Sequence, residues 1–428
     1  MENNEQKLNI DTNENANRGD SNSECTEEVY GRARRVRSRR KFLKATLITL
    51  IAFLLVITCT GTAILLPLLR EYADSYSKVD IITRDSEQTL PPVPTGTWVE
   101  VTHDITETMP PETSYPETTE DPDNPGGTNV PVIVDGIYKV EKKNPDVENI
   151  LVVGTDSRDM SSMRGRSDTM IVCSYNRRTG EAKLLSLMRD VLVPIEGYDV
   201  NKDGVDYDWN RLNATYSLGG IALCINTINQ VFDLDIQRFV IINFEGTEKL
   251  VDACGGVDLT LTDVGETGAT SEKVFIEAYG GTVTLLDEGG EGSSYYHLNG
   301  KAALIHMRHR YGSSDYKRTE RQRNVLMALF RQVVSSRDLS EIYGLVREGF
   351  NMIKTNIPLD EMINLAASVV GNGANMSIGS QRMPHKATNV YFHIGNQQPV
   401  GAGQGGASVL KIDSAYEAQR IKEYIYGK

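Results

Sequence analysis

Cysteine, tryptophan and histidine are scarce in this sequence, and basic residues are outnumbered by acidic ones. Its 428 residues include five cysteines, two tryptophans and six histidines, and the formal net charge is -13. No two cysteines have the C-x-x-C spacing, which argues against a zinc ribbon and against a fold stabilised by a set of disulfides. An acidic chain repels nucleic acid unless its basic residues are clustered, so we expect no nucleic-acid partner.

Long hydrophobic runs are also rare, and only one, Ala45 to Leu69, is long enough to cross a bilayer. It contains no charged residue and suits a helix that spans a hydrocarbon core of roughly 30 Å. Seven basic residues precede it between Gly31 and Lys41, which predicts a cytoplasmic N-terminus with the rest of the chain outside. A cleaved signal peptide is the alternative, but its apolar core would be shorter.

The composition on either side of this run divides the chain into four parts. Residues 1–44 are polar and then basic, and we predict a disordered cytoplasmic tail. Residues 45–69 form the transmembrane anchor, and residues 70–130, rich in Thr, Pro, Glu and Asp, form an extended extracellular linker. Residues 131–428 have a globular composition and are predicted to be an extracellular domain.

Strand-like and helical patterns alternate in the globular part. The strand-like runs are 149–153, 169–175, 182–187, 238–243 and 257–261, and the helical patterns are 220–232, 244–254, 319–334, 335–370 and 414–426. Such alternation predicts a layered α/β domain with helices covering both faces of a sheet.

The polar stretch between the first two strand-like runs carries the first chemical signal. Asp156 and Asp168 stand near its two ends, and Arg158, Arg164 and Arg166 lie between them. Carboxylates supply the hard oxygen ligands that Mg²⁺ prefers, and guanidinium groups bind phosphate oxygens in pairs. The stretch therefore indicates a metal-assisted phosphate site. A solvated loop with surface ion pairs is the alternative.

Three further clusters of basic residues follow along the chain. Arg189 comes directly after a strand-like run, where layered α/β folds gather ligand-binding groups. Arg308 and Arg310 share a face if their segment is extended, and Arg318 and Gln322 share one face of a helix. Gathering so many arginines is costly without an anion, and a diphosphate would bind two or three of them together with Mg²⁺. For the last two clusters, a solvated basic face is the alternative.

Short motifs spread over about residues 150–329 resemble those of the LytR-CpsA-Psr family in order and spacing. The matching residues are Val152 to Arg158, Arg166 to Met170, Ser186 to Asp190, Leu212 to Tyr216, Val251 to Val257, Leu298 to Gly300, Arg308 to Arg310 and Arg318 to Gln322. Two positions depart from the family pattern. Met188 stands where the family usually has Pro, and Arg211 stands where it usually has Lys, which keeps the charge but changes its reach.

The resemblance implies a single-pass protein of the cell membrane, with one transmembrane helix before a three-layer α/β domain that has a central mixed sheet. Its extracellular domain, residues 131–428, would be a phosphotransferase. The reaction would move a glycopolymer from an undecaprenyl diphosphate carrier onto the peptidoglycan of the cell wall. The polyprenyl chain would lie in an apolar channel between sheet and helices.

The resemblance also implies roles for individual residues. Asp156 and Asp168 would bind Mg²⁺ or a similar divalent cation, and either could accept the hydroxyl proton, although a metal ligand is a poor base. The catalytic residues would be Asp168, Arg189 and Arg308. The residues that would bind the diphosphate are Arg166, Arg189, Arg211, Arg308, Arg310, Arg318 and Gln322. Arginines there would stabilise charge at the reacting phosphorus, which is the main need of phosphoryl transfer.

Two other functions remain as alternatives. One is a non-catalytic sensor or scaffold of wall synthesis that binds a polyprenyl diphosphate, although such a protein would not need both carboxylates. The other is a hydrolase that cleaves the diphosphate with water.

Three weaker signals favour ordinary structural roles. Asp199 to Gly204 resembles the front of a calcium loop, but the twelfth position is Asn210 rather than Glu. His306 and His309 have no evident third ligand, so packing is their expected role. Cys224 and Cys254 are expected to be unpaired, because their spacing alone gives no disulfide geometry.

Overall fold

The computed structural model describes most of the globular part of the chain and short pieces before it. The described residues are 76, 79–84, 90–98, 134–156, 167–200, 202, 207–262, 271–289, 292–309, 315–335, 353–358, 361, 365, 368, 377–401 and 406–427. The predicted tail and span, residues 1–69, lie outside them, and so do the candidate site residues Arg166 and Arg310. Within the described ranges, no helix combines the length and the apolar composition needed to cross a membrane.

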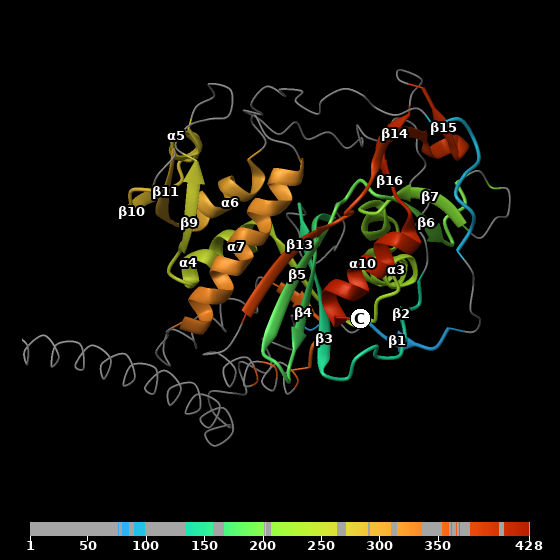
Figure 1. Ribbon diagram of the computed structural model, residues 1–428, viewed down its shortest axis with the longest axis horizontal. Helices are drawn as coiled ribbons and strands as arrows, with labels where there is room; N and C mark the ends of the chain where they lie inside the picture. The colour runs from blue at the N-terminus through green and yellow to red at the C-terminus, as the bar shows by residue number, and fades with distance from the viewer. Residues whose placement is uncertain are drawn as a thin grey trace, which may run out of the picture.

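A six-stranded mixed sheet forms the centre of the domain (Figure 1). Its strands are β3 (Val147–Thr155), β4 (Ser167–Asn176), β5 (Glu181–Leu187), β8 (Arg238–Asn243), β12 (Ile353–Thr355) and β13 (Ser377–Met383). Their order is β12-β8-β3-β4-β5-β13, in which β3 is parallel to β8 and β5 is parallel to β13. The other neighbours are antiparallel, so the expected mixed sheet is confirmed.

The strand-like runs of the sequence correspond to β3, β4, β5, β8 and β9 (Val257–Thr262). These runs are rich in β-branched and other apolar residues, as expected for strands buried on at least one face. The helix predicted over residues 335–370 is wrong in part, because residues 353–355 form β12, which pairs with β8. The pairing of β12 across the sheet edge, rather than local helix propensity, determines its conformation there.

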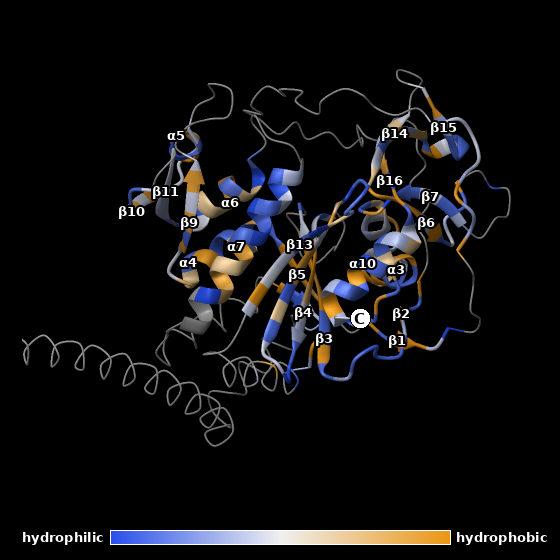
Figure 2. Ribbon diagram, in the orientation of Figure 1, coloured by the Kyte–Doolittle hydropathy of each residue, from blue (hydrophilic) through white to orange (hydrophobic). Residues whose placement is uncertain are grey.

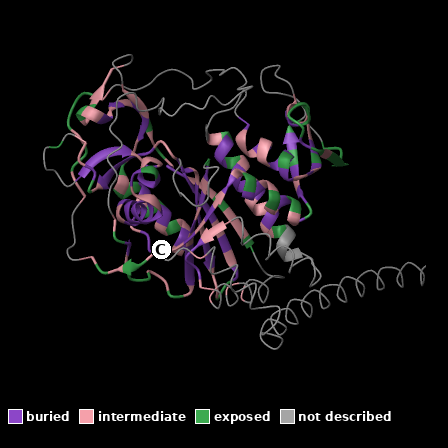
Figure 3. Ribbon diagram, turned by 180° about the vertical axis from the view of Figure 1, so that it is seen from behind, coloured by how far each residue is buried: buried purple, intermediate pink, exposed green. Residues whose placement is uncertain are grey.

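Helices pack on both faces of the sheet and give three layers (Figure 1). α3 (Ala214–Phe232) and α10 (Ser414–Tyr426) cover one face, and α7 (Asp315–Ser335) packs against β4, β5 and β13 from the other. The first face holds a large core in which Leu151, Leu185 and Ile225 are fully buried. Each such side chain contributes roughly 1.5–3 kcal/mol through burial. Figure 2 shows the hydrophobic residues concentrated along β3, and Figure 3 shows that the sheet is largely buried.

A smaller unit shares α7 with the main sheet. It contains α4 (Phe244–Ala253), α5 (Glu272–Ala278), α6 (Gly300–Arg308) and the antiparallel sheet β10-β11-β9, with β10 (Val283–Asp287) and β11 (Ser293–Leu298). Its separate core includes Val251 and Leu298, and α7 contributes Val325 to it. The first turns of α7 contact both units, because Thr319 lies against Met188 beside the main sheet and Arg321 pairs with Glu272 of the smaller unit.

Short strands lie on the side of the domain opposite the smaller unit (Figure 1). They are β6 (Leu192–Glu196), β7 (Tyr207–Arg211), β14 (Thr388–His393), β15 (Gln398–Val400) and β16 (Ala407–Lys411). Parts of the predicted linker 70–130 pack here as well. β1 (Ile81–Ile82) pairs with β2 (Ile137–Tyr138), and the ring of Trp98 stacks on Phe392 with centroids 5.9 Å apart. The division of the chain into tail, span, linker and domain otherwise stays a prediction.

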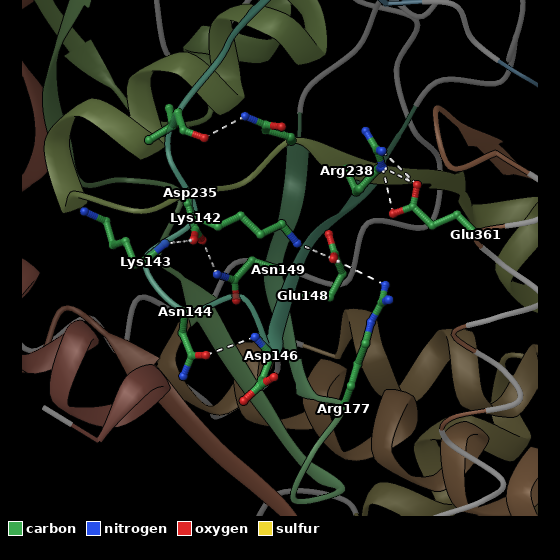
Figure 4. A network of polar contacts seen from close by, with 12 residues as sticks. Lys142, Lys143, Asn144, Asp146, Glu148, Asn149, Arg177, Asp235, Arg238 and Glu361 are labelled. Carbon is green, nitrogen blue, oxygen red and sulfur yellow. Dashed lines mark hydrogen bonds and ion pairs between the residues drawn. The ribbon is translucent and has the colours of Figure 1, made fainter.

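A polar network holds the end of β3 that lies away from the loop between Asp156 and Asp168 (Figure 4). Asn149 of β3 donates to Asp235 at 2.5 Å, and Tyr426 of α10 donates to the same carboxylate oxygen at 2.7 Å. Buried polar groups are costly unless they are hydrogen-bonded, and here the amide nitrogen of Asn149, the Tyr426 hydroxyl and Asp235 satisfy one another. The network therefore joins the first strand of the domain to its last helix.

Candidate functional site

The hairpin of β3 and β4 presents both candidate carboxylates at one end of the sheet. Thr155 of β3 pairs with Ser167 of β4, and the register shifts there, because Gly154 pairs with Thr169. Asp168 is therefore the extra residue of a β-bulge, a device that re-aims a side chain at the rim of a sheet. Asp156 directly follows β3 and is exposed. The two carboxylates thus lie at the same end of one hairpin.

Arg189 lies beside Asp168 and joins it to a second carboxylate. Nη1 of Arg189 donates to Oδ1 of Asp168 at 3.0 Å, and Nε of Arg189 lies 3.4 Å from Oδ2 of Asp190. The other oxygen of Asp190 lies 3.7 Å from Nε of Arg211. The side chains of Asp168 and Arg189 are 24% and 17% exposed, so the group opens to solvent without being fully solvated. We call Asp168, Arg189, Asp190 and Arg211 the Asp168–Arg211 network.

Backbone hydrogen bonds from three separate segments hold the turn that carries Arg189. The carbonyl of Arg189 accepts from the N–H of Asn213 at 3.1 Å, and the N–H of Met188 donates to the carbonyl of Met383 at 3.0 Å. The carbonyl of Asp190 accepts from the N–H of Leu410 at 2.8 Å. The backbone of this turn is therefore held by residues at or near the ends of β7, β13 and β16.

The first turns of α7 pack over the same turn. Oγ1 of Thr319 lies 3.9 Å from Sδ of Met188, the residue before Arg189. Arg318 and Gln322, one turn apart on this helix, are buried at 4% and 5% exposure. Arginine is seldom fully buried unless its charge is paired. The burial of Arg318 beside the Arg189 turn therefore indicates a polar environment there.

Arg308 reaches the site from the smaller unit. Its guanidinium lies 4.3 Å from the centre of the Phe244 ring, at the start of α4. Phe244 directly follows Asn243, the last residue of β8, and Asn243 pairs with Thr155 at the end of β3. Arg308 therefore stands at the sheet end that carries Asp156, held by a cation–π contact.

An ion-paired cluster fixes the end of the helix that carries Arg308. Oε1 of Glu272 lies 2.8 Å from Nδ1 of His306 and 3.0 Å from Nε of Arg321. Nη1 of Arg321 donates to the carbonyl of His309, the residue after Arg308, at 3.0 Å. Burial favours the neutral carboxyl, but the hydrogen bond with His306 and the charges of His306, Arg321 and His309 outweigh it and lower the pKa of Glu272 to about 2.

The structure thus brings several of the predicted residues to one end of the sheet. Asp168, Arg189 and Arg211 are joined directly, Arg318 and Gln322 lie on the helix that packs over the Arg189 turn, and Arg308 approaches from the other side. Arg166 and Arg310 lie outside the described residues. Sequence reasoning assigned no role to Asp190, Glu272 or Arg321. The position of Asp190 next to Arg189 was a usable signal, whereas only the fold pairs Glu272 with Arg321.

The weaker signals have structural explanations. His306 is paired with buried Glu272, and the ring of His309 packs edge-on against Phe275. Among the residues that the structure describes, Cys173, Cys224 and Cys254 form no disulfide with one another, and burial raises the pKa of the Cys173 and Cys224 thiols to about 12. The calcium-loop candidate lies partly outside the described residues, which include Asp199 but not Asp203.

The carboxylates at the hairpin end fit a magnesium ion that is shared with a phosphate ligand. Mg²⁺ is commonly bound through one or two carboxylates together with phosphate oxygens and water, rather than by a cage of protein ligands. Asp156 and Asp168 supply two such oxygen donors at one end of a hairpin. In the described part of the chain, no group of three or more His, Cys, Asp or Glu side chains is arranged to hold a metal.

The domain is a layered α/β fold that gathers arginines and carboxylates at one end of its sheet, where folds of this class commonly bind their ligands. The model of the LytR_cpsA_psr family matches residues 117–404 of this chain. The chain therefore belongs to this family, and the resemblance found in its motifs is confirmed.

Two relatives are 32% and 29% identical to this chain over the residues that align. Biofilm regulatory protein A of Streptococcus mutans is 32% identical over 216 residues, which are 49% of this chain and 50% of the relative. The polyisoprenyl-teichoic acid–peptidoglycan teichoic acid transferase TagU of Oceanobacillus iheyensis is 29% identical over 237 residues, which are 55% and 67% of the two chains. The match thus spans half the length of the first of these relatives. Among solved structures, TagV of Bacillus subtilis aligns with a TM-score of 0.48 at 21% identity, over 66% of this chain and 98% of that one.

Proposed function

We propose that this chain is a transferase that moves a glycopolymer from an undecaprenyl diphosphate carrier onto peptidoglycan. Family membership supports the proposal, because relatives are named as polyisoprenyl-teichoic acid–peptidoglycan teichoic acid transferases. The observation that carries it is the Asp168–Arg211 network at the end of the sheet, in which Arg189 lies 3.0 Å from Asp168. A diphosphate offers the oxygens that such guanidinium groups bind.

The proposed reaction is a phosphoryl transfer. A sugar hydroxyl of peptidoglycan attacks the phosphorus that bears the polymer, the bond from this phosphorus to the bridging oxygen breaks, and polyisoprenyl phosphate leaves. Negative charge on the phosphate oxygens must be stabilised as these bonds change. Arg189 suits this task because Asp168 and Asp190 fix its guanidinium before any substrate arrives.

The other arginines have distinct parts in this proposal. Arg318 and Gln322 would bind the diphosphate from α7, and Arg308 from α6. Arg166, Arg211 and Arg310 would complete the set. Mg²⁺, when bound by Asp156 and Asp168, would neutralise charge on the diphosphate. We propose further that residues 45–69 anchor the domain in the membrane with the N-terminus in the cytoplasm, which would keep the site close to a lipid substrate.

The decisive experiment incubates the full-length chain in detergent with a polyprenyl-diphosphate-linked glycopolymer, Mg²⁺ and peptidoglycan. We expect polyprenyl phosphate to be released in step with polymer attachment, and Arg189→Gln to slow attachment roughly 100-fold. Arg178→Gln is the matched control, because Arg178 forms an exposed surface pair with Asp146.

The same experiment separates the alternatives. Release of free polymer phosphate without an acceptor would indicate a hydrolase. Saturable binding of the lipid without any turnover would indicate a sensor or scaffold. Either result would overturn the proposed transfer.

A further inference from the structure

A second pair of arginines lies between α7 and the edge strand β13, and it belongs to neither the Asp168–Arg211 network nor the family motifs described above. Arg323 of α7 is 7% exposed, and its Nε donates to Oγ of Ser380 on β13 at 2.7 Å. Arg382, two residues further along β13, lies on the same face of the strand as Ser380. The two guanidinium groups thus approach the same strip of the sheet edge from opposite elements.

The Arg382 guanidinium lies over an aromatic ring. Its central carbon lies 4.1 Å from the centre of the Tyr316 ring, in the first turn of α7. A guanidinium that stacks on a ring can still donate hydrogen bonds from its edge. Tyr316 therefore orients Arg382 without using the donors that an anion would need.

Three buried polar atoms in this strip have no hydrogen-bond partner among the residues that the structure describes. They are Nη1 of Arg323, Nε of Arg382 and Oγ of Ser186, and Ser186 is the β5 neighbour of Arg382 in the parallel register. Neither Arg323 nor Arg382 forms an ion pair with any residue that the structure describes. Leaving a buried donor unsatisfied destabilises the fold, and more so when the group is charged.

The charges in the strip also oppose one another. Burial is the main cause that lowers the pKa of Arg323. The charge of Glu320 opposes this effect, and the nearby positive charge of Arg382 adds to it, with a smaller opposing effect of Tyr424. Like charges placed together in a partly buried setting are stabilised when an anion binds between them. The strip has the chemistry of an anion site.

Solvent reaches this strip. Ser380 is exposed and Arg382 is half-buried, because β13 is the outer strand of the sheet. The next residue of β13, Met383, accepts a hydrogen bond from Met188, which precedes Arg189. A ligand bound at the Asp168–Arg211 network is therefore separated from Arg382 by one short turn and one strand end.

We propose that Arg323 and Arg382 form a second anion subsite that binds a phosphate group of the glycopolymer, beyond the carrier diphosphate. This inference rests on the proposed function, since it names the part of the substrate that lies outside the diphosphate site. A substrate with phosphates in its polymer would bind at both places at once, and a substrate without them would bind only at the first.

The test compares Arg323→Gln/Arg382→Gln with wild type, using the full-length chain in detergent and three probes. The probes are farnesyl diphosphate, a polyprenyl-diphosphate-linked disaccharide, and the same disaccharide carrying one glycerol phosphate unit. We expect the double variant to bind the first two within about twofold of wild type and the third about tenfold more weakly. Arg331→Gln, an exposed arginine on the same helix, is the matched control and should bind all three normally.

The outcomes decide between sources of the phosphate. Equal loss for all three probes would mean that these arginines belong to the carrier diphosphate site, and it would overturn the subsite. Normal binding of all three would overturn it as well. Arg382→Lys keeps the charge at a half-buried position, so it should bind the third probe more tightly than Arg382→Gln does. A folding defect would weaken the binding of all three probes and would give no such difference between the two variants.

A separate readout keeps this inference distinct from the proposed function. Glycerol 3-phosphate binding is followed by ³¹P NMR line broadening in wild type, Arg323→Gln/Arg382→Gln and Arg189→Gln. The subsite predicts that the double variant loses this broadening and Arg189→Gln keeps it, whatever the chain does with lipid diphosphates. Loss in Arg189→Gln alone would contradict the subsite, whereas failure to bind farnesyl diphosphate would contradict only the proposed function.

Discussion

Arg189 and Asp168 are joined by a 3.0 Å hydrogen bond between residues of two different segments, the turn after β5 and the bulge at the start of β4. The contact fixes an arginine whose backbone is already tied to the ends of three strands. A cation arranged in this way loses little conformational freedom when it binds an anion, because its side chain is ordered beforehand.

Asp190 is expected to act as a positioning residue. Its carboxylate lies 3.4 Å from Nε of Arg189 and 3.7 Å from Nε of Arg211, so it sets the orientation of both guanidinium groups. Asp190→Asn keeps the size and removes the charge. We expect kcat for polymer transfer to fall about tenfold, with a smaller change in KM, because the arginines remain but are less well aimed. Asp146→Asn, which loosens an exposed ion pair, is the control and should leave both constants unchanged. Equal kinetics for Asp190→Asn and wild type would exclude this role.

The Phe244 ring is expected to set the position of Arg308. The guanidinium of Arg308 lies 4.3 Å from the ring centre, a cation–π contact worth roughly 0.5–2 kcal/mol. Phe244→Leu removes the ring, and we expect it to weaken binding of farnesyl diphosphate about three- to tenfold in an equilibrium titration. Phe244→Tyr retains an aromatic face and should restore most of the affinity. If Leu and Tyr variants bind alike, the ring does not position Arg308.

Much of this fold could be predicted from local patterns. The apolar runs of β3, β4, β5 and β8 identify the central strands, and the 3.6-residue period of α7 and α10 identifies two covering helices. Asp168 and Arg189 could be predicted to lie together, because each stands next to a strand end in a layered domain. These features depend on a few neighbouring residues, which the sequence displays directly.

Other parts of the site depend on pairings across long stretches of chain. β13 adds to β5 although Met383 and its partner Leu187 are far apart in sequence, and this pairing is what brings Arg382 next to the Arg189 turn. Glu272 meets Arg321 only because α5 and α7 pack in the same small unit. No local period marks either contact, so no reading of short motifs would have found them.

The Glu272 cluster is expected to lose stability in acid. The pKa of Glu272 is lowered from its ordinary value of 4.5 to about 2. A carboxyl with a lowered pKa stabilises the folded state above its unfolded pKa, and this contribution disappears as the pH falls through the folded pKa. The shift corresponds to about 3 kcal/mol at neutral pH, of which we expect roughly 2 kcal/mol to be lost by pH 3.

Urea unfolding of Glu272→Gln at pH 7 and pH 3 measures this contribution. We expect the variant to be less stable than wild type by about 2–3 kcal/mol at pH 7 and by much less at pH 3. Glu277→Gln changes an exposed carboxylate of the same helix and should have the same free energy of unfolding as wild type at both pH values. A deficit for Glu272→Gln that does not shrink in acid would show that its charge is not the cause.

Tyr426 is expected to hold the last helix to the sheet. Its hydroxyl donates to Asp235 at 2.7 Å and accepts from Asn149 of β3 at 2.8 Å, and burial together with the charge of Asp235 raises the pKa of this phenol. Tyr426→Phe removes both hydrogen bonds to the buried residues Asn149 and Asp235. We expect the free energy of unfolding in urea to fall by about 1–3 kcal/mol, while binding of farnesyl diphosphate stays unchanged, because the network lies at the far end of β3 from Asp168. Tyr416→Phe, at the exposed start of the same helix, is the matched control and should change neither quantity. Equal stability of the two variants would mean that packing of α10, rather than this hydroxyl, secures the end of the chain.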